Sequence, residues 1–104
     1  MRTRTKSQIM QYLEKIIGGP LAIGKLFVAV REGEELSQAD FAKRLGISRA
    51  NLCDIEKGRR FISEEMAERF AEKLGESKEQ FVRLAIQERL AREGLHYRIE
   101  VAAA

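Results

Sequence analysis

Residues 36–60 have the sequence LSQADFAKRLGISRANLCDIEKGRR, which predicts two short helices joined by a tight turn. Ser37 is a favourable N-cap, and Asp40 three residues later completes the pattern of a capping box. Apolar residues then recur on one side of the first helix. Gly46 stands where that helix must end, and Ser48 is placed to cap the next one.

The second helix of this stretch carries small and polar residues on the side away from its apolar face. Leu52 and Ile55 form the inward face. Arginine and aspartate can hydrogen-bond base edges, and alanine can contact a thymine methyl group. We therefore predict base contacts from Arg49, Ala50, Cys53 and Asp54. Polar or basic residues that could hold phosphates are Asn51, Lys57, Arg59 and Arg60.

The segments LSQADFA (36–42), LGIS (45–48) and IEKG (55–58) resemble the helix-turn-helix of the Cro/phage-repressor (XRE) family. The resemblance covers roughly half of the chain and implies an all-α, lambda-repressor-like bundle whose second motif helix enters the major groove of DNA. It also implies phosphate contacts from Gln38 and Ser48. Finally, it implies a structural ion pair between Arg31 and Glu56.

The remaining helical patterns extend this bundle into one domain, residues 1–104, with the motif at 37–58. Residues 21–93 are predicted to form the bundle, in which Gly33 ends the first helix and serines cap the last two. Apolar spacing over residues 8–17 predicts an extra N-terminal helix. Residues 1–7 are predicted to be a flexible basic arm, which is either a plain tail or a contact to DNA.

The C-terminal segment, residues 95–104, has a different pattern. Tyr97, Ile99 and Val101 alternate with polar residues, which predicts a short β-strand. A lone strand leaves its backbone groups unpaired. The segment is therefore either a frayed tail or a strand that pairs with another chain. The partner would be a second copy in an antiparallel ribbon or the sheet edge of a different protein.

Composition excludes several classes of function. The chain has 104 residues and a net charge of +3, with +3 on residues 37–60 and −2 on residues 61–104. Residues 1–17 also sum to +3, so the positive charge falls on the motif and on the N-terminal arm. No apolar stretch predicts a membrane span or a signal peptide. One cysteine, Cys53, fits a reducing cytoplasm, and a small neutral packing role is favoured for it over a redox role. Cys53 and His96 are too isolated to predict a metal site, so no cofactor and no enzyme activity are expected.

These patterns predict a cytoplasmic, sequence-specific DNA-binding repressor that acts as a homodimer on double-stranded DNA. The size and layout also resemble the antitoxins of bacterial toxin–antitoxin pairs, which implies a toxin as a further partner and repression of the protein's own operon. The alternative is a protein–protein adaptor that keeps the fold without specific DNA binding.

Overall fold

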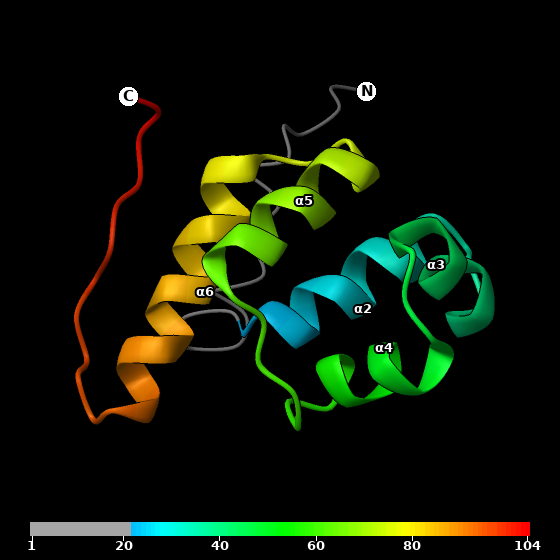
Figure 1. Cartoon of the computed structure of the whole chain (residues 1–104), viewed down its shortest axis with the longest axis horizontal. Coiled ribbons are helices and arrows are strands. Elements are labelled where there is room, and N and C mark those ends of the chain that lie inside the picture. The colour runs from blue at the N-terminus through cyan, green and yellow to red at the C-terminus, as the bar shows by residue number, and fades with distance from the viewer. Residues whose placement is uncertain (1–21) are drawn as a thin grey trace, which may run out of the picture.

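The structure, a computed structural model, describes residues 22–104, and this range contains five helices. Their bounds are α2 Ile23–Gly33, α3 Gln38–Leu45, α4 Arg49–Glu56, α5 Glu64–Leu74 and α6 Lys78–Arg92 (Figure 1). The predicted all-α class is confirmed over this range. The predicted basic arm at 1–7 and the predicted helix at 8–17 lie outside the described residues.

The starts of α3 to α6 follow directly from local sequence. Each begins after a serine whose hydroxyl oxygen accepts the backbone N–H three residues later, and these serines are Ser37, Ser48, Ser63 and Ser77. A cap of this kind stabilises a helix by about 1 kcal/mol. Gly46 and Gly75 end α3 and α5 in the left-handed conformation, at φ values of 77° and 67°.

α2 ends at Gly33, as the sequence predicts, but the left-handed residue comes two positions later. Gly33 is the last residue of α2, but the left-handed residue that turns the chain is Glu35, at φ 56°. The N–H of Leu36 then donates to Arg31 O at 3.0 Å. A non-glycine residue in this conformation costs about 1 kcal/mol. The hydrogen bond of Leu36 offsets part of this cost at Glu35.

The start of α2 has no cap of its own, because the side chain of its N-cap residue, Ala22, makes no capping hydrogen bond. The acceptor comes from α6 instead. Glu88 Oε1 accepts the N–H of Ile23 at 2.9 Å. Partial burial raises the pKa of the Glu88 carboxyl, and the opposing effects of the Ile23 N–H and of Arg92 are smaller. α6 thus holds the first turn of α2 through a half-buried carboxylate.

Replacing Glu88 by Gln is expected to raise the free energy of unfolding at pH 7, because the amide oxygen still accepts the Ile23 N–H and the half-buried charge is removed. A carboxyl with a raised pKa binds its proton more tightly in the native state. Its contribution to stability is therefore largest below the unfolded-state pKa and is lost as pH rises through the folded-state pKa. Urea unfolding should show the advantage of Glu88→Gln at pH 7 shrinking toward about pH 4.

A control variant, Glu88→Ala, removes the acceptor altogether and should lose about 1 kcal/mol at pH 7. A wild-type protein that is more stable than Glu88→Gln at pH 7, with a margin that grows as pH rises, would show that the carboxylate is favoured by its site.

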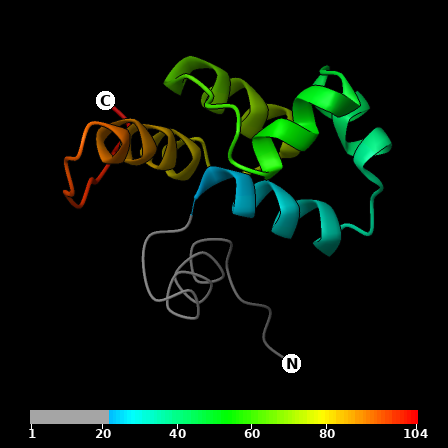
Figure 2. The same cartoon turned by 90° about the horizontal axis from the view of Figure 1, so that it is seen from below.

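The core lies where α2 meets α3, α5 and α6. Phe27 of α2 is fully buried and contacts the rings of Phe41, Phe70 and Phe81 at centroid distances of 6.2, 5.7 and 5.8 Å. Figure 2 shows α2 running from α6 at its N-terminal end toward α3 at its C-terminal end. One helix therefore connects the motif to the C-terminal helix.

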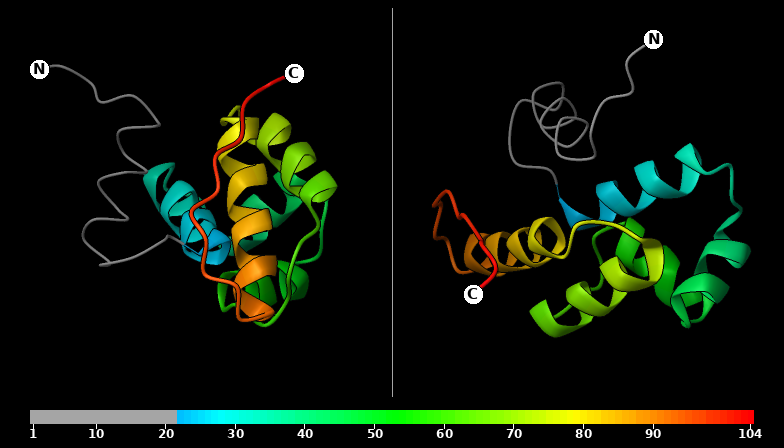
Figure 3. Two further views of the ribbon diagram at one scale, coloured as in Figure 1. Left: turned by 90° about the vertical axis from the view of Figure 1, so that its left-hand side faces the viewer. Right: turned by 90° about the horizontal axis from the view of Figure 1, so that it is seen from above.

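The predicted C-terminal strand is wrong for the described chain. Residues 95–104 form no strand and run alongside α6 as an irregular segment (Figure 3). Gly94, at φ 76°, ends the helical turn, and Leu95 N donates to Leu90 O at 2.9 Å. Gln87 Nε2 then donates to the carbonyl of Tyr97 at 3.0 Å. The described part of the chain contains no strand. An alternating segment therefore has no neighbouring strand here with which to form backbone hydrogen bonds.

Candidate nucleic-acid interface

The motif consists of α3 and α4 with a three-residue connection. Gly46 takes the left-handed conformation, and Ile47 N donates to Ala42 O at 3.0 Å, which closes the end of α3. The hydroxyl of Ser48 accepts the N–H of Asn51 at 3.0 Å and starts α4. Lys73 of α5 donates from Nζ to Leu45 O, the last carbonyl of α3, at 3.0 Å. The turn is thus held both by its own backbone and by a neighbouring helix.

The two faces of α4 are clearly different in burial. Leu52 and Ile55 are fully buried in the core, as the pattern of apolar residues predicts. The four candidates for base contacts lie on the rest of the helix surface. Arg49 and Ala50 are exposed, and Cys53 and Asp54 are half-buried. Cys53 is a free thiol. Arg49 has the longest side chain of these four residues, and it stands in the first turn of α4.

Two of the candidate phosphate contacts, Ser48 and Asn51, already take part in the start of α4. The hydroxyl of Ser48 is used as the cap, although its residue is exposed. Asn51 is half-buried, and its Oδ1 is buried with no hydrogen-bond partner. The amide nitrogen Nδ2 is therefore the side-chain atom with which Asn51 can donate a hydrogen bond to an anion. Around these residues, the backbone N–H groups of the first turn of α4 add partial positive charge.

A basic turn follows α4 directly. Lys57, Arg59 and Arg60 are all exposed, and Gly58 between them has φ 74°. The N–H groups of Arg59 and Arg60 donate to Asp54 O at 2.8 and 3.2 Å, which folds this turn back onto the helix. Arg59 lies 3.8 Å from the carboxylate of Asp54, an exposed and weak ion pair. Three cationic side chains therefore extend from one short turn at the end of α4.

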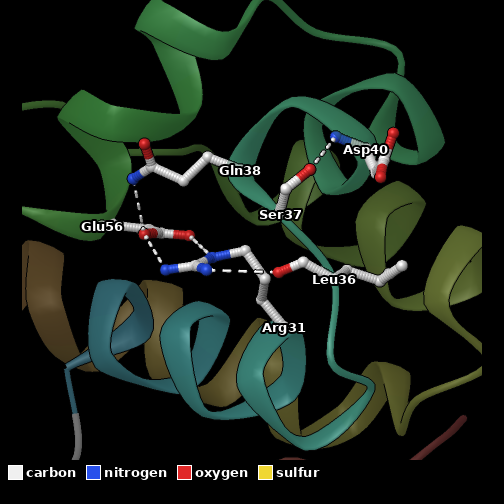
Figure 4. Close-up of polar contacts among 6 residues, drawn as sticks. All are labelled: Arg31, Leu36, Ser37, Gln38, Asp40 and Glu56. Atoms are coloured by element: carbon white, nitrogen blue, oxygen red, sulfur yellow. Dashed lines mark hydrogen bonds and ion pairs between the residues drawn. The ribbon is translucent and has the colours of Figure 1, made fainter.

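Arg31 and Glu56 form a bidentate ion pair between α2 and the last residue of α4. Arg31 Nε donates to Glu56 Oε2 at 2.8 Å, and Arg31 Nη2 donates to Glu56 Oε1 at 3.1 Å (Figure 4). Arg31 Nη1 also donates to Leu36 O at 3.3 Å. Only 5% of the Glu56 side chain is exposed. The hydrogen bond to Glu56 raises the pKa of the Arg31 guanidinium, so this residue is charged at every relevant pH.

Gln38 also points at this ion pair. Its Nε2 donates to Glu56 Oε1 at 3.0 Å, so Glu56 is contacted from α2 and from the first residue of α3 (Figure 4). From the sequence, Gln38 was predicted to contact phosphate only. Nothing in the local sequence indicates the contact with Glu56, because the two residues are 18 positions apart. The side chain is half-buried, which leaves part of its amide accessible.

Two further residues that hold the motif were missed at the sequence level. Lys73 caps α3 from α5, and no sequence signal marks such a contact between residues 28 positions apart. Gly24 is buried in α2 beside the backbone of α4. A glycine inside an apolar helical pattern is a signal that could have found it, because such a glycine usually has a packing reason.

A family model described as a helix-turn-helix domain matches residues 22–84 of the chain. The chain belongs to the helix-turn-helix domain family. The match includes α2 to α5 and the first part of α6, so it covers the motif together with the helices that hold it. Comparisons with curated proteins and with solved structures gave no match.

None of the helices in residues 22–104 is long and apolar enough to cross a membrane. The same residues contain no cluster of three or more side chains of the histidine, cysteine, aspartate and glutamate types that could hold a metal ion.

Proposed function

We propose that this helix-turn-helix protein is a sequence-specific DNA-binding transcriptional repressor of the Cro/phage-repressor (XRE) type. The observation that carries the proposal is the separation of roles along α4. Its inner face is buried, its last residue is held by Arg31 and Gln38, and its first turn exposes Arg49 and Ala50. A rigidly held helix with an exposed first turn is the arrangement that reads the major groove.

The residues fall into two groups by what they can contact. Arg49, Ala50, Cys53 and Asp54 would meet base edges, and Arg49 is the strongest candidate because arginine can bind guanine O6 and N7 together. The remaining polar and basic residues would contact phosphates and set the register on the duplex, and these are Gln38, Ser48, Asn51, Lys57, Arg59 and Arg60. Occupancy of an operator would block transcription without a ligand.

A homodimer follows from the way this type of motif reads DNA. Two copies would place their recognition helices in successive major grooves, roughly 34 Å apart, on a nearly palindromic site. The C-terminal tail offers a contact for the second copy. It leaves Tyr97 64% exposed, whereas Ile99 and Val101 are half-buried. Sedimentation of a chain that ends at Leu95 tests this contact, and an unchanged dimer would place the interface elsewhere.

The resemblance to antitoxins extends the proposal to a second partner. Residues 61–104 have a net charge of −2, which suits a basic toxin protein. The operator would then lie upstream of the protein's own gene. Co-expression with the neighbouring reading frame tests this extension, and a frame that neither binds the chain nor is toxic alone would remove it.

The test of DNA recognition begins with selection of duplexes from a random library by the wild-type protein. Arg49→Ala should weaken binding to the enriched duplex by about tenfold or more and relax the base preference at one position, since a bidentate base contact contributes about 1–3 kcal/mol. Arg59→Ala should weaken binding to enriched and scrambled duplexes alike and lower the salt dependence by about one phosphate.

Arg69→Ala is the matched control, because Arg69 on α5 is as exposed as Arg59 and its loss removes the same charge. It should change neither affinity by more than about twofold. Equal effects of all three variants would contradict the assignment of contacts. A library in which no duplex is enriched would favour the adaptor alternative. A footprint limited to one half-site would contradict the homodimer.

A further inference from the structure

Gly24 lies in close contact with the backbone at the end of α4. It is buried, and a Cβ atom added to it would lie 2.3 Å from Ile55 O and 3.0 Å from Glu56 O. Both oxygens belong to the backbone of the last turn of α4. No side chain can rotate away to make room, so the absence of a Cβ at position 24 is what allows the two helices to come this close.

The same face of α2 contacts α4 a second time. Arg31 lies seven residues after Gly24, which is two helical turns and about 10 Å along the helix. Its guanidinium holds the carboxylate of Glu56, whereas Gly24 meets the backbone of Ile55 and Glu56. The last turn of α4 is therefore held at its main chain and at its terminal side chain by one face of one helix.

We propose that Gly24 is a positioning residue for DNA recognition, because it sets how closely the C-terminal end of α4 approaches α2 and thereby sets the tilt of the recognition helix. This inference rests on the proposed function for its effect on DNA, but the position of α4 can be measured without DNA. Gly24 itself would touch no base or phosphate.

A Cβ atom at position 24 would clash with backbone atoms, which cannot rotate away. Real Cβ atoms essentially never approach an oxygen closer than 3.0 Å, so an alanine at position 24 must push Ile55 O away by at least about 0.7 Å. α4 is only eight residues long, and its other end is held at the turn by Ser48. A displacement of one end therefore rotates the whole helix. Hydrogen bonds to base edges tolerate only a few tenths of an ångström, whereas phosphate attraction is less demanding of geometry.

The test compares Gly24→Ala with Gly33→Ala, which makes the same chemical change in the same helix. An added Cβ at Gly33 has no neighbour within 4 Å. Residual dipolar couplings of backbone N–H groups in the DNA-free protein report the orientation of α4 relative to α5 and α6. We expect Gly24→Ala to change the couplings of residues 49–56 together and Gly33→Ala to leave them unchanged. Couplings of α4 that are equal in both variants would overturn the proposal.

The second arm uses the duplex that the wild-type protein enriches from a random library and a scrambled duplex of the same composition. Gly24→Ala should lower affinity for the enriched duplex by about tenfold or more and for the scrambled duplex by less than about twofold. Gly33→Ala should leave both affinities unchanged. A rotated α4 with unchanged affinity for the enriched duplex would overturn the role in recognition.

The two failures are distinguishable. If the wild-type protein enriches no duplex, the proposed function fails, and the dipolar couplings still decide whether Gly24 positions α4. If Gly24→Ala does not fold alone, the double variant Gly24→Ala and Gly33→Ala is used. The change at the exposed Gly33 is expected to stabilise the helix by about 0.5–1 kcal/mol. The comparison is then made against Gly33→Ala.

Discussion

Phe27→Ala is expected to remove most of the stability of the helical bundle. Phe27 is fully buried, and its ring contacts three other phenylalanine rings from α3, α5 and α6. Truncation of a core phenylalanine to alanine costs about 3–5 kcal/mol, because transfer energy is lost and a cavity remains. The aromatic contacts add about 0.5–1.5 kcal/mol for each pair. Domains of this size are stable by only about 5–15 kcal/mol.

The measurement is urea unfolding followed by circular dichroism at the helical band. Phe61→Ala is the matched control, because Phe61 is 45% exposed. Within residues 22–104, its ring stacks on no other aromatic ring and meets only the guanidinium of Arg92, whose carbon Cζ lies 3.6 Å from the ring centroid. Its loss should cost about 1 kcal/mol or less. Phe27→Leu should fall between the two. Equal midpoints for Phe27→Ala and Phe61→Ala would mean that the four-ring cluster is not the centre of the core.

Arg31→Ala is the second large effect, with an expected loss of about 3–5 kcal/mol. The variant removes both hydrogen bonds that Arg31 makes to Glu56 and leaves a carboxylate that is only 5% exposed with Gln38 as its remaining partner. An uncompensated buried charge is the main cost, rather than the lost attraction. α4 should also be held less firmly, because its last residue loses the contact with α2.

A double-mutant cycle separates these causes. Replacing both Arg31 and Glu56 by methionine removes the pair without leaving a charge and should recover most of the stability. The exposed pair of Arg69 and Glu65, whose side chains are 64% and 75% exposed, is the control and should contribute less than about 1 kcal/mol. A double variant that is as unstable as Arg31→Ala would show that the ion pair itself stabilises the fold.

If the double variant folds well but binds the enriched duplex weakly, the ion pair orients α4 more than it stabilises the bundle. In that case the double variant lowers the affinity for the enriched duplex without lowering the free energy of unfolding. Gly24→Ala provides the parallel case, since it alters the approach of the backbone and leaves the ion pair in place. Together the two contacts would make α2 the helix that determines the orientation of the recognition helix.

The motif itself was predictable to a large extent. Residues 37–58 contain two capped helices, a left-handed glycine at the turn and an apolar face made by Leu52 and Ile55, and the structure has each of these features. The ion pair of Arg31 and Glu56 is present as the resemblance to the Cro/phage-repressor family implied. The assignment of individual side chains to bases and phosphates stays a prediction, because it depends on a duplex.

The predicted end of α2 at Gly33 is confirmed, although Glu35 is the residue that takes the left-handed conformation after it. The error lies in the C-terminal segment, where a local pattern conflicts with the surrounding structure. Residues 95–104 alternate like a strand, yet the described chain has no strand for them to pair with. The alternating pattern of this segment lacked the tertiary partner that a strand needs.

The sequence by itself determined the features that need only a few neighbouring residues: where α3 to α6 begin, where α3 and α5 end, and which face of each helix is apolar. Serine caps and left-handed glycines act over three or four residues, so their effect depends only on the local sequence. Only the tertiary structure decided that Glu88 caps α2 from 65 residues away, and that Gly24 meets the backbone of α4. These contacts depend on how closely two helices approach, which is a property of the packed core as a whole and not of any segment.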